Sequence, residues 1–461
     1  MDGSPVVHKA ECQHFNDAGD VDSCKQICDL PRAIILCILA FLPIEDAVRT
    51  SVLLRWWEYL WTSIPSIVFN EDHYCGNMPF GNFLERVLLL CDLSSIKAFS
   101  LTCMVDKEVY YDGNESRVNS WITAAIRRNV EELCLHLTVD CRDTVYMLPH
   151  CMFRCETLRE LHLEMNHDLK LPSSVCLTNL KVLCLTEVWF EDDNSVEKLL
   201  LCPSLEKLSV DCCIWDLEVL QISAPNLLYL TIVEEVLLSS YQNSQVRIHG
   251  ASVKSFDYFG LFLYDYIVLT SSSLVEASIQ VWQEQISIQG TYRLYKFLKA
   301  LSNVKQLLFY IREEILKSFP IFHNLTKLEL NDIHKHLEPR ALLLLLGRCP
   351  ILNSYGVVVA SKNDDWISDT LPPCFTSSLK EIVICCFQGS NSELLALRIF
   401  LRTAAVLEKL LIYCLNGHLW CYQGNMMEHL NELPRASNQC IILLEEGHCS
   451  TIRKRREFDD M

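Results

Sequence analysis

The chain has 461 residues, of which 50% are hydrophobic and 21% are charged, and its formal net charge is −18. This length exceeds one ordinary compact core and predicts two or three domains or one elongated repeat array. Nucleic acids and anionic membranes are bound by clustered lysine and arginine side chains, so the acidic balance excludes both as main partners.

The 24 cysteines indicate reduced, largely buried thiols, because many lie beside leucines in apolar stretches. Residues 1–32 carry six acidic against three basic residues, whereas a secretory signal begins with a positive region. The apolar run over residues 33–42 is also far shorter than the roughly 20 residues of a membrane span. We therefore expect an intracellular protein, in the cytoplasm or nucleus, without a membrane anchor.

Residues 1–26 are polar and predict a flexible tail. A metal site is conceivable there, from Cys24 and Cys28 with His8, Cys12 and His14 nearby. A structural zinc site, however, needs two close ligand pairs at defined spacing. The pattern favours ordinary thiols, with no metal and no cofactor.

The segment over residues 30–61 predicts three short helices. Pro31 suits the first turn of a helix, and Pro43 ends that helix. One face carries residues at four-residue spacing, with two further apolar residues beside them: Leu30, Ile34, Ile38, Leu42, Ile35 and Leu39. The opposite face is apolar as well, through Leu36, Ala40 and Phe41. Such a helix must be covered on two sides, either by the chain's own remaining domain or by a partner.

These residues resemble an F-box of the plant type. The matching stretches are Leu30-Pro31, Ile38 to Pro43, Asp46 to Leu53 and Trp57 to Trp61. The resemblance implies docking onto the Skp adaptor of an SCF-type (cullin–RING) ubiquitin ligase. The residues to which it assigns that contact are Leu30, Pro31, Ile35, Ile38, Leu39, Leu42, Pro43, Val48, Val52 and Trp57. The sequence departs from the family pattern at Arg32-Ala33, Leu54-Arg55 and Trp56.

A pattern of apolar-x-x-apolar-x-apolar recurs 13 times from IKAFSL to LEKLLI at a mean period of about 26 residues, within the leucine-rich-repeat range. Its last two apolar positions share one face of a short strand. We expect an α/β fold in which stacked parallel strands line the concave face of a solenoid, with helices at 196–202 and 340–349 on the convex side. The alternative is a non-solenoid α/β domain. The middle apolar residues are Phe99, Leu133, Leu161, Leu183, Leu208, Leu230, Phe256, Ala277, Leu307, Leu328, Tyr355, Ile382 and Leu410.

Further stretches resemble the same plant family of F-box/FBD/leucine-rich-repeat proteins. They are the segment VNSWITAAIRRNVEELCL at 118–135, the repeats LLLCPSLEKLSV and ISAPNLLYLTI, and an FBD-like stretch that starts at SSLKEIVICC. The fold is thus expected to be a small all-α F-box, then a leucine-rich-repeat solenoid closed by an FBD segment. The expected boundaries are a tail at 1–26, the F-box at 27–70, repeats at 90–365, the FBD domain at 366–445 and a basic tail at 446–461.

The resemblance implies a non-catalytic substrate receptor: the F-box binds the Skp adaptor and, through it, cullin, while the concave face holds an unknown target protein. Candidate target contacts are Glu160, His162, Glu164, Thr186, Asp211, Glu329 and Asn331. Two alternatives stay open: an interaction scaffold whose altered F-box no longer docks, and a metal- or thiol-dependent enzyme, which no local signature supports. Arg453 to Arg456 form a basic stretch that is either an import signal or a solvated tail.

Overall fold

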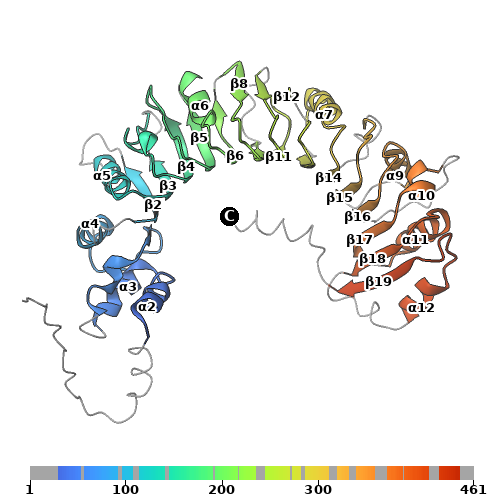
Figure 1. Ribbon diagram of the computed structural model, residues 1–461, viewed down its shortest axis with the longest axis horizontal. Helices are drawn as coiled ribbons and strands as arrows, with labels where there is room; N and C mark the ends of the chain where they lie inside the picture. Colours follow the sequence, from blue (N-terminus) through green and yellow to red (C-terminus); the bar gives the residue numbers. More distant parts are fainter. Residues whose placement is uncertain are drawn as a thin grey trace, which may run out of the picture.

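The protein forms an open arch of parallel strands in the computed structural model (Figure 1). The structure describes residues 30–52, 57–91, 96–106, 114–140, 145–190, 193–215, 217–234, 244–269, 272–281, 286–310, 319–331, 339–358, 371–387, 389–414 and 425–446.

The inner side of the arch is a 16-stranded sheet in which neighbouring strands pair in parallel. Its strands follow one another in chain order, so each repeat adds one strand beside the previous one. Along the sheet they are β1 (Ser66–Asn70), β2 (Ala98–Asp106), β3 (Glu132–Asp140), β4 (Glu160–Leu169), β5 (Val182–Phe190), β6 (Lys207–Asp211), β9 (Tyr229–Val233), β11 (Ser255–Gly260), β13 (Glu276–Val281), β14 (Gln306–Tyr310), β15 (Lys327–Asn331), β16 (Ser354–Val358), β17 (Glu381–Phe387), β18 (Lys409–Cys414) and β19 (Ile441–Glu446), with the short β7 (Ile214–Trp215) beside β5.

The 13 predicted middle residues stand opposite one another in a single register, from Phe99 on β2 to Leu410 on β18. None of them is more than 4% exposed. Ile67 on β1 and Ile442 on β19 extend this row at both ends. Complete burial of such a side chain stabilises by about 1.5–3 kcal/mol, so the row is a main source of cohesion along the arch. The predicted array of parallel strands is therefore confirmed.

Most helices lie on the outer side of the arch, as expected (Figure 1). The predicted segments 196–202 and 340–349 correspond to α6 and α9. The helical elements are α2 (Arg32–Leu39), α3 (Ile44–Arg49), η1 (Thr50–Val52), η3 (Leu60–Ser63), α4 (Phe80–Leu90), α5 (Glu115–Ile126), η4 (Met152–Arg154), α6 (Asp193–Leu200), α7 (Ile288–Ala300), α9 (Pro339–Leu346), α10 (Pro373–Ser377), α11 (Asn391–Thr403) and α12 (Asn425–Glu432).

Near the middle of the arch the outer side is a second parallel sheet, which the sequence analysis did not predict. It consists of β12 (Asp265–Val268), β10 (Gln245–Ile248) and β8 (Val219–Ile222). Only 22 residues separate Leu208 from Leu230, and 21 separate Phe256 from Ala277. Such short repeats leave little chain for a returning helix, and the returning segments alternate apolar and polar residues as strands do.

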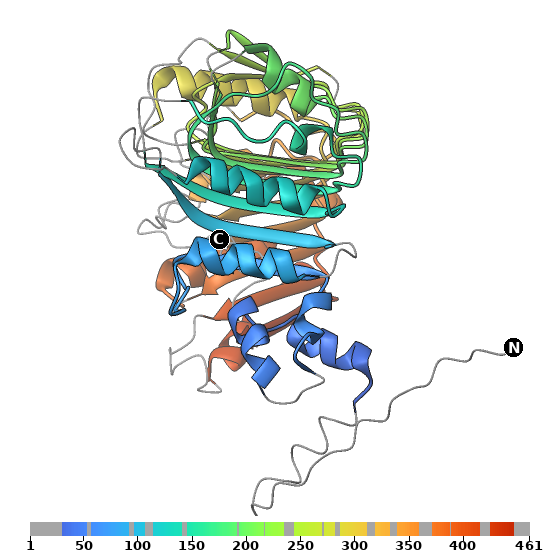
Figure 2. The ribbon, with the colours of Figure 1, turned by 90° about the vertical axis from the view of Figure 1, so that its left-hand side faces the viewer.

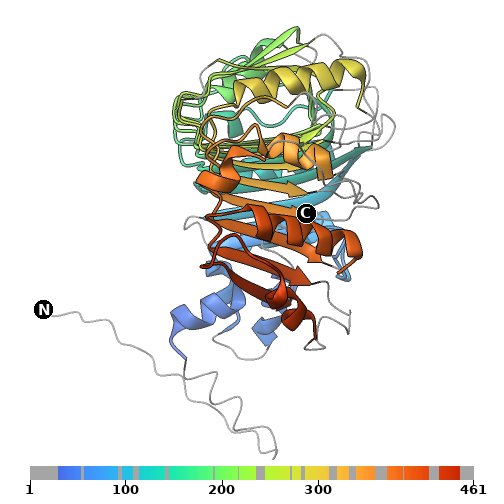
Figure 3. The same ribbon diagram turned by 90° about the vertical axis from the view of Figure 1, so that its right-hand side faces the viewer.

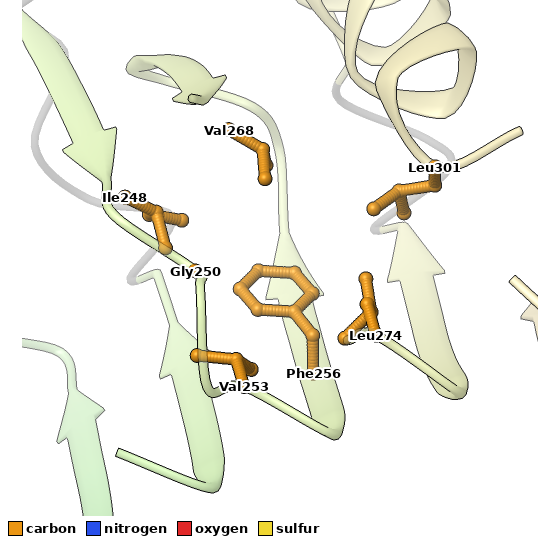
Figure 4. Close-up of a pocket in the computed structure, with 7 residues that line it drawn as sticks. All are labelled: Ile248, Gly250, Val253, Phe256, Val268, Leu274 and Leu301. Atoms are coloured by element: carbon orange, nitrogen blue, oxygen red, sulfur yellow. The ribbon is translucent and has the colours of Figure 1, made fainter. Parts of the chain in front are cut away.

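The space between the two sheets holds a small gap (Figure 4). Its lining residues come from both layers and carry no polar side chain: Ile248, Gly250, Val253, Phe256, Val268, Leu274 and Leu301. A site for chemistry or for a specific ligand needs polar groups that converge on it. The gap is therefore imperfect packing between the sheets rather than a binding site.

A buried glutamate organises the same region. Glu234, 5% exposed, follows β9 and accepts hydrogen bonds from the hydroxyls of Tyr258 (2.7 Å) and Tyr266 (2.8 Å). It also accepts from the backbone N–H groups of Leu261 and Leu263, each at 3.0 Å. Burial, the largest cause, raises the pKa of this carboxyl group. Four donors directed at one carboxylate fix the turn that leads into β12.

The N-terminal helices cover one end of the arch. In Figure 2, α2 and α3 lie at the end of the sheet beyond α4, and α3 contacts β1. At the opposite end, α11 crosses the outside of the sheet near β17 and β18 (Figure 3). Ser390 caps α11 in a capping box, because its side chain accepts from the N–H of Glu393 while the Glu393 carboxylate accepts from the N–H of Ser390.

Candidate functional site

An apolar surface is exposed at the N-terminal end of the arch, and we call it the apolar end surface. It consists of five side chains from α2, the turn after it and η1, with exposed fractions of 47% for Ile34, 44% for Ile38, 90% for Phe41, 39% for Leu42 and 87% for Val52. Exposed apolar residues scattered singly are normal, but five within 19 positions, on α2, the turn after it and η1, indicate a contact surface.

The local sequence explains why this face points outward. Ile35 and Leu39 form the inner face of α2 and are 0% and 1% exposed. They belong to the same core as Trp61 of η3, which α2 contacts. Ile34 and Ile38 therefore lie one step around the helix from the buried stripe and stay in water, and Leu42 is exposed in the turn that follows. Pro43 then starts α3, whose first turn holds Glu45 and Asp46.

The predicted adaptor contacts divide into two groups. Pro31, Ile38, Leu42, Pro43 and Val52 are exposed, and Leu30 and Val48 are partly buried. Ile35, Leu39 and Trp57, by contrast, are buried in the chain's own core. These three side chains hold the helices in place and do not form part of the exposed surface.

Two exposed residues, Ile34 and Phe41, were missing from the predicted set. Ile34 lies four residues before Ile38 and Phe41 three residues after it, and both helical spacings were visible in the sequence. The departures at Leu54-Arg55 and Trp56 lie outside the described residues. At the other departure, Arg32 donates a hydrogen bond to the Ser63 hydroxyl at 3.2 Å, and the first turn of α2 carries no acidic residue.

The second candidate surface is on the concave side of β3 to β6. Parallel neighbours lie about 4.8 Å apart, so residues in register form continuous rows across the sheet. One row brings together His136, Glu164, Thr186 and Asp211 on four successive strands. We call these four residues, together with Cys134, Glu160 and His162 from the same strands, the concave polar patch.

Five predicted target contacts therefore meet in this patch: Glu160, His162, Glu164, Thr186 and Asp211. Glu329 lies apart from them on β15, where its carboxylate is 2.5 Å from the Lys327 ammonium. Asn331 ends the same strand. The structure thus separates the seven predicted contacts into two groups along the concave face.

The patch contains a chain of three interacting side chains. The Cys134 Sγ lies 3.0 Å from the His136 Nε2, and the His136 Nδ1 lies 2.7 Å from the Glu164 Oε2. An ionised Glu164 accepts the Nδ1–H, and the protonated imidazole donates its Nε2–H to the Cys134 sulfur. The hydrogen bond to Cys134, followed by its charge and the contact with Glu164, raises the pKa of His136 to about 9 against the effect of burial.

Burial is the main cause of the pKa shifts of two other groups in the patch, His162 and Asp211. Burial lowers the pKa of His162 despite the nearby Glu160 carboxylate, and the neighbouring charges of Lys207 and His136 lower it further. Burial also raises the pKa of Asp211, and the negative charge of Glu164 adds to this rise. The patch therefore combines an imidazole stabilised as a cation with carboxylates that gain from a cationic partner.

No group of three His, Cys, Asp or Glu side chains within the described ranges is arranged to hold a metal ion. The N-terminal candidates at His8, Cys12, His14, Cys24 and Cys28 lie outside those ranges, as does the basic stretch Arg453 to Arg456. Across the described part of the chain, no helix combines the length and hydrophobicity needed to cross a bilayer.

Two family models match the sequence. The LRR repeats of "FBD-associated F-box protein At5g56370" match residues 118–252, and the FBD model matches residues 368–412. The first match begins within α5, the helix that precedes β3, and ends in the segment before β11. The second covers β17, α11 and most of β18.

Several relatives from Arabidopsis thaliana are similar over most of their length. F-box/FBD/LRR-repeat protein At4g26340 is 30% identical over 316 residues, which are 67% of this chain and 71% of that protein. F-box/FBD/LRR-repeat protein At5g56420 is 27% identical over 452 residues, which are 91% and 99% of the two chains. F-box/LRR-repeat protein At3g26922 is 32% identical over 286 residues, or 61% and 88%.

Proposed function

Because the chain belongs to the plant family of F-box/FBD/LRR-repeat proteins, we propose that it is a substrate-receptor subunit of an SCF-type ubiquitin ligase. In this proposal the apolar end surface binds the Skp adaptor, and through it cullin, while the concave face holds a target protein. The observation that carries the proposal is the exposure of Ile34, Ile38, Phe41, Leu42 and Val52.

The energy of adaptor binding follows from that exposure. Covering Phe41 and Val52, which are 90% and 87% exposed, contributes about 1.5–3 kcal/mol each. The three half-exposed side chains contribute roughly half as much each. The total of about 5–10 kcal/mol is comparable to the 4–15 kcal/mol that association costs. Additional contacts at the rim, from Pro31, Pro43 and Val48, are therefore needed for a stable complex.

The concave face is the proposed target-binding surface, and its chemistry favours a basic target. Glu164 and Asp211 flank Thr186 in one row, and burial raises the pKa of Asp211, so a cation bound beside it would stabilise the ionised form. The receptor supplies no catalytic group in this mechanism. Holding the target near the enzyme that carries ubiquitin raises the effective concentration of the target's lysines.

Co-purification with the Skp adaptor tests the proposal. The wild-type chain is expected to form a stable 1:1 complex, and Phe41→Asp is expected to abolish it because a carboxylate would be buried in the interface. Ile288→Asp is the matched control: Ile288 is 93% exposed on α7, so the same change leaves the complex intact. Equal capture of both variants would contradict the assignment of this surface.

The second candidate function is an interaction scaffold that joins no ligase. One observation favours it: α2 begins with Arg32 and has no acidic residue in its first turn, where negative charge favours a helix N-terminus by about 0.3–1 kcal/mol. Under this alternative the wild-type chain captures no adaptor at micromolar concentration, while the concave face still binds its target. Charge reversal at Asp211 then lowers target capture without any effect on the ligase.

A further inference from the structure

The Cys134–His136–Glu164 chain has the arrangement that activates a thiol, and neither the family resemblance nor the proposed function uses it. A nucleophile, a base within hydrogen-bond reach of it and a third group that orients the base are the parts required. Here the thiol-to-imidazole distance is 3.0 Å and the imidazole-to-carboxylate distance is 2.7 Å. The three residues come from the adjacent strands β3 and β4, whose rigid pairing holds this geometry.

The side chains of Cys134, His136 and Glu164 are accessible to solvent. The His136 side chain is 39% exposed and that of Glu164 is 47% exposed, while Cys134 is half-buried beside them. Most other thiols in the described ranges differ, because they are buried among apolar side chains. Burial, for example, raises the pKa of Cys103 on β2 to about 12.

We propose that Cys134 is a nucleophilic modification site on the concave face that adds to α,β-unsaturated carbonyl compounds. In the reacting form the thiol proton is held on the His136 Nε2 as a thiolate–imidazolium pair, and the thiolate sulfur forms a bond to the β-carbon of the alkene. The π electrons move to the α-carbon, which takes the proton back from His136. The product is a thioether with a neutral imidazole, so no leaving group or further reactant is needed.

Addition fits this site better than acyl transfer. An acyl-transfer intermediate needs N–H donors for its oxyanion. The backbone N–H groups beside Cys134 and His136 are engaged in the pairing of β3 with its neighbours. A single imidazole that both takes and returns a proton is sufficient for addition. Glu164 is a positioning residue here, because it orients His136 and does not touch the thiol in the described geometry.

The test measures modification of the intact protein by N-ethylmaleimide, with each cysteine followed by peptide mass spectrometry at pH 6 and pH 8. An ordinary thiol is expected to react roughly 75-fold more slowly at pH 6 than at pH 8, from the fraction ionised. We expect Cys134 to slow less than tenfold, because the neighbouring His136 imidazolium keeps the sulfur as a thiolate at both pH values. The exposed Cys37 and Cys176 are internal references in the same sample.

The titratable groups that face this thiol are Glu132 and His136 on β3 and Glu160, His162 and Glu164 on β4, while β2 presents Ser100 and Thr102. His136→Asn is expected to give Cys134 the steep pH dependence of Cys37, and Glu164→Gln an intermediate one. His323→Asn, at an exposed histidine in the segment before β15, is the control and is expected to leave the profile within about twofold. Circular dichroism confirms that each variant is folded.

A wild-type Cys134 as pH-sensitive as Cys37, or a His136→Asn profile identical to wild type, would overturn the proposal. The measurement needs no adaptor or target, so its outcome is independent of the proposed ligase function. If His136→Asn fails to fold, the wild-type comparison with Cys37 and Cys176, together with Glu164→Gln, still decides the question.

Discussion

Replacing Glu234 by alanine is expected to destabilise the middle of the arch strongly. The substitution removes the acceptor of two tyrosine hydroxyls and two backbone N–H groups, all in a site where Glu234 is 5% exposed. A buried donor without a partner costs about 1–3 kcal/mol, and water that enters the vacated space recovers part of this. We expect a loss of about 3–5 kcal/mol, a large share of the 5–15 kcal/mol typical of native proteins.

The turn at Phe262 makes the region more sensitive. Phe262 is fully buried with a φ of 55°, a conformation unfavourable for a bulky side chain, and its N–H donates to the Tyr258 hydroxyl at 2.6 Å. Glu234→Gln retains one acceptor oxygen, so its expected cost is smaller, about 1–2 kcal/mol. Urea unfolding followed by circular dichroism gives the free energies. Hydrogen exchange is expected to accelerate first over residues 255–268.

Glu276→Ala is the matched control, because this glutamate is exposed on β13 and its loss should change stability by less than about 0.5 kcal/mol. A Glu234→Ala variant within 1 kcal/mol of wild type would show that the turn does not depend on this carboxylate. It would mean that the tyrosine hydroxyls and the turn find other acceptors.

The pKa of His136 is raised from 6.5 to about 9, so protonated His136 stabilises the fold. This contribution is fully present below about pH 6.5 and is lost as the pH rises through 9. Urea unfolding of His136→Asn at several pH values should lack that loss. Leu161→Ala in the buried row is expected to cost about 2–5 kcal/mol and to accelerate hydrogen exchange in β3 to β5, and unchanged exchange would contradict nearest-neighbour stacking. Ser390→Ala should cost about 1 kcal/mol by thermal unfolding, and Ser390→Asp, which can still cap α11, should cost less.

The buried row was predictable because its residues repeat at a bounded period and burial enforces register. Shifting a strand by one residue would expose Leu161 and bury Glu160, so the apolar pattern determines both the strand and its alignment. The apolar-x-x-apolar-x-apolar pattern also occurs at Ile64, Ile67 and Phe69, where β1 lies. This strand was not predicted because the pattern directly follows a segment with helical spacing. The outer β-sheet was missed because periodicity in four-residue segments is weak.

The concave polar patch was predictable only in part. The sequence placed Glu160, His162 and Glu164 on the concave side of their strand, and the structure adds Cys134 and His136 beside them. Their mutual contacts depend on which residues of β3 and β4 stand opposite each other, and on side-chain rotamers. Alignment of the buried row at Leu133 and Leu161 would have shown His136 opposite Glu164. The contact between Cys134 and His136, two residues apart on one strand, required the coordinates.

The outward-facing side of the apolar end surface could not be predicted from the sequence. Helical periodicity predicted that α2 would be apolar on both sides, but not which side faces the first repeats. The structure assigns Ile35 and Leu39 to the inside and Ile38 and Phe41 to the outside. A substitution at Leu39 would therefore test the stability of the chain rather than adaptor binding.

Isothermal titration of the purified chain with the Skp adaptor at several temperatures measures whether the apolar end surface binds the adaptor. Burial of the apolar end surface predicts 1:1 binding with a negative heat-capacity change, and Phe41→Asp should remove both while Ile288→Asp preserves them. Absence of binding at micromolar concentration, or binding that Phe41→Asp leaves unchanged, would contradict the account.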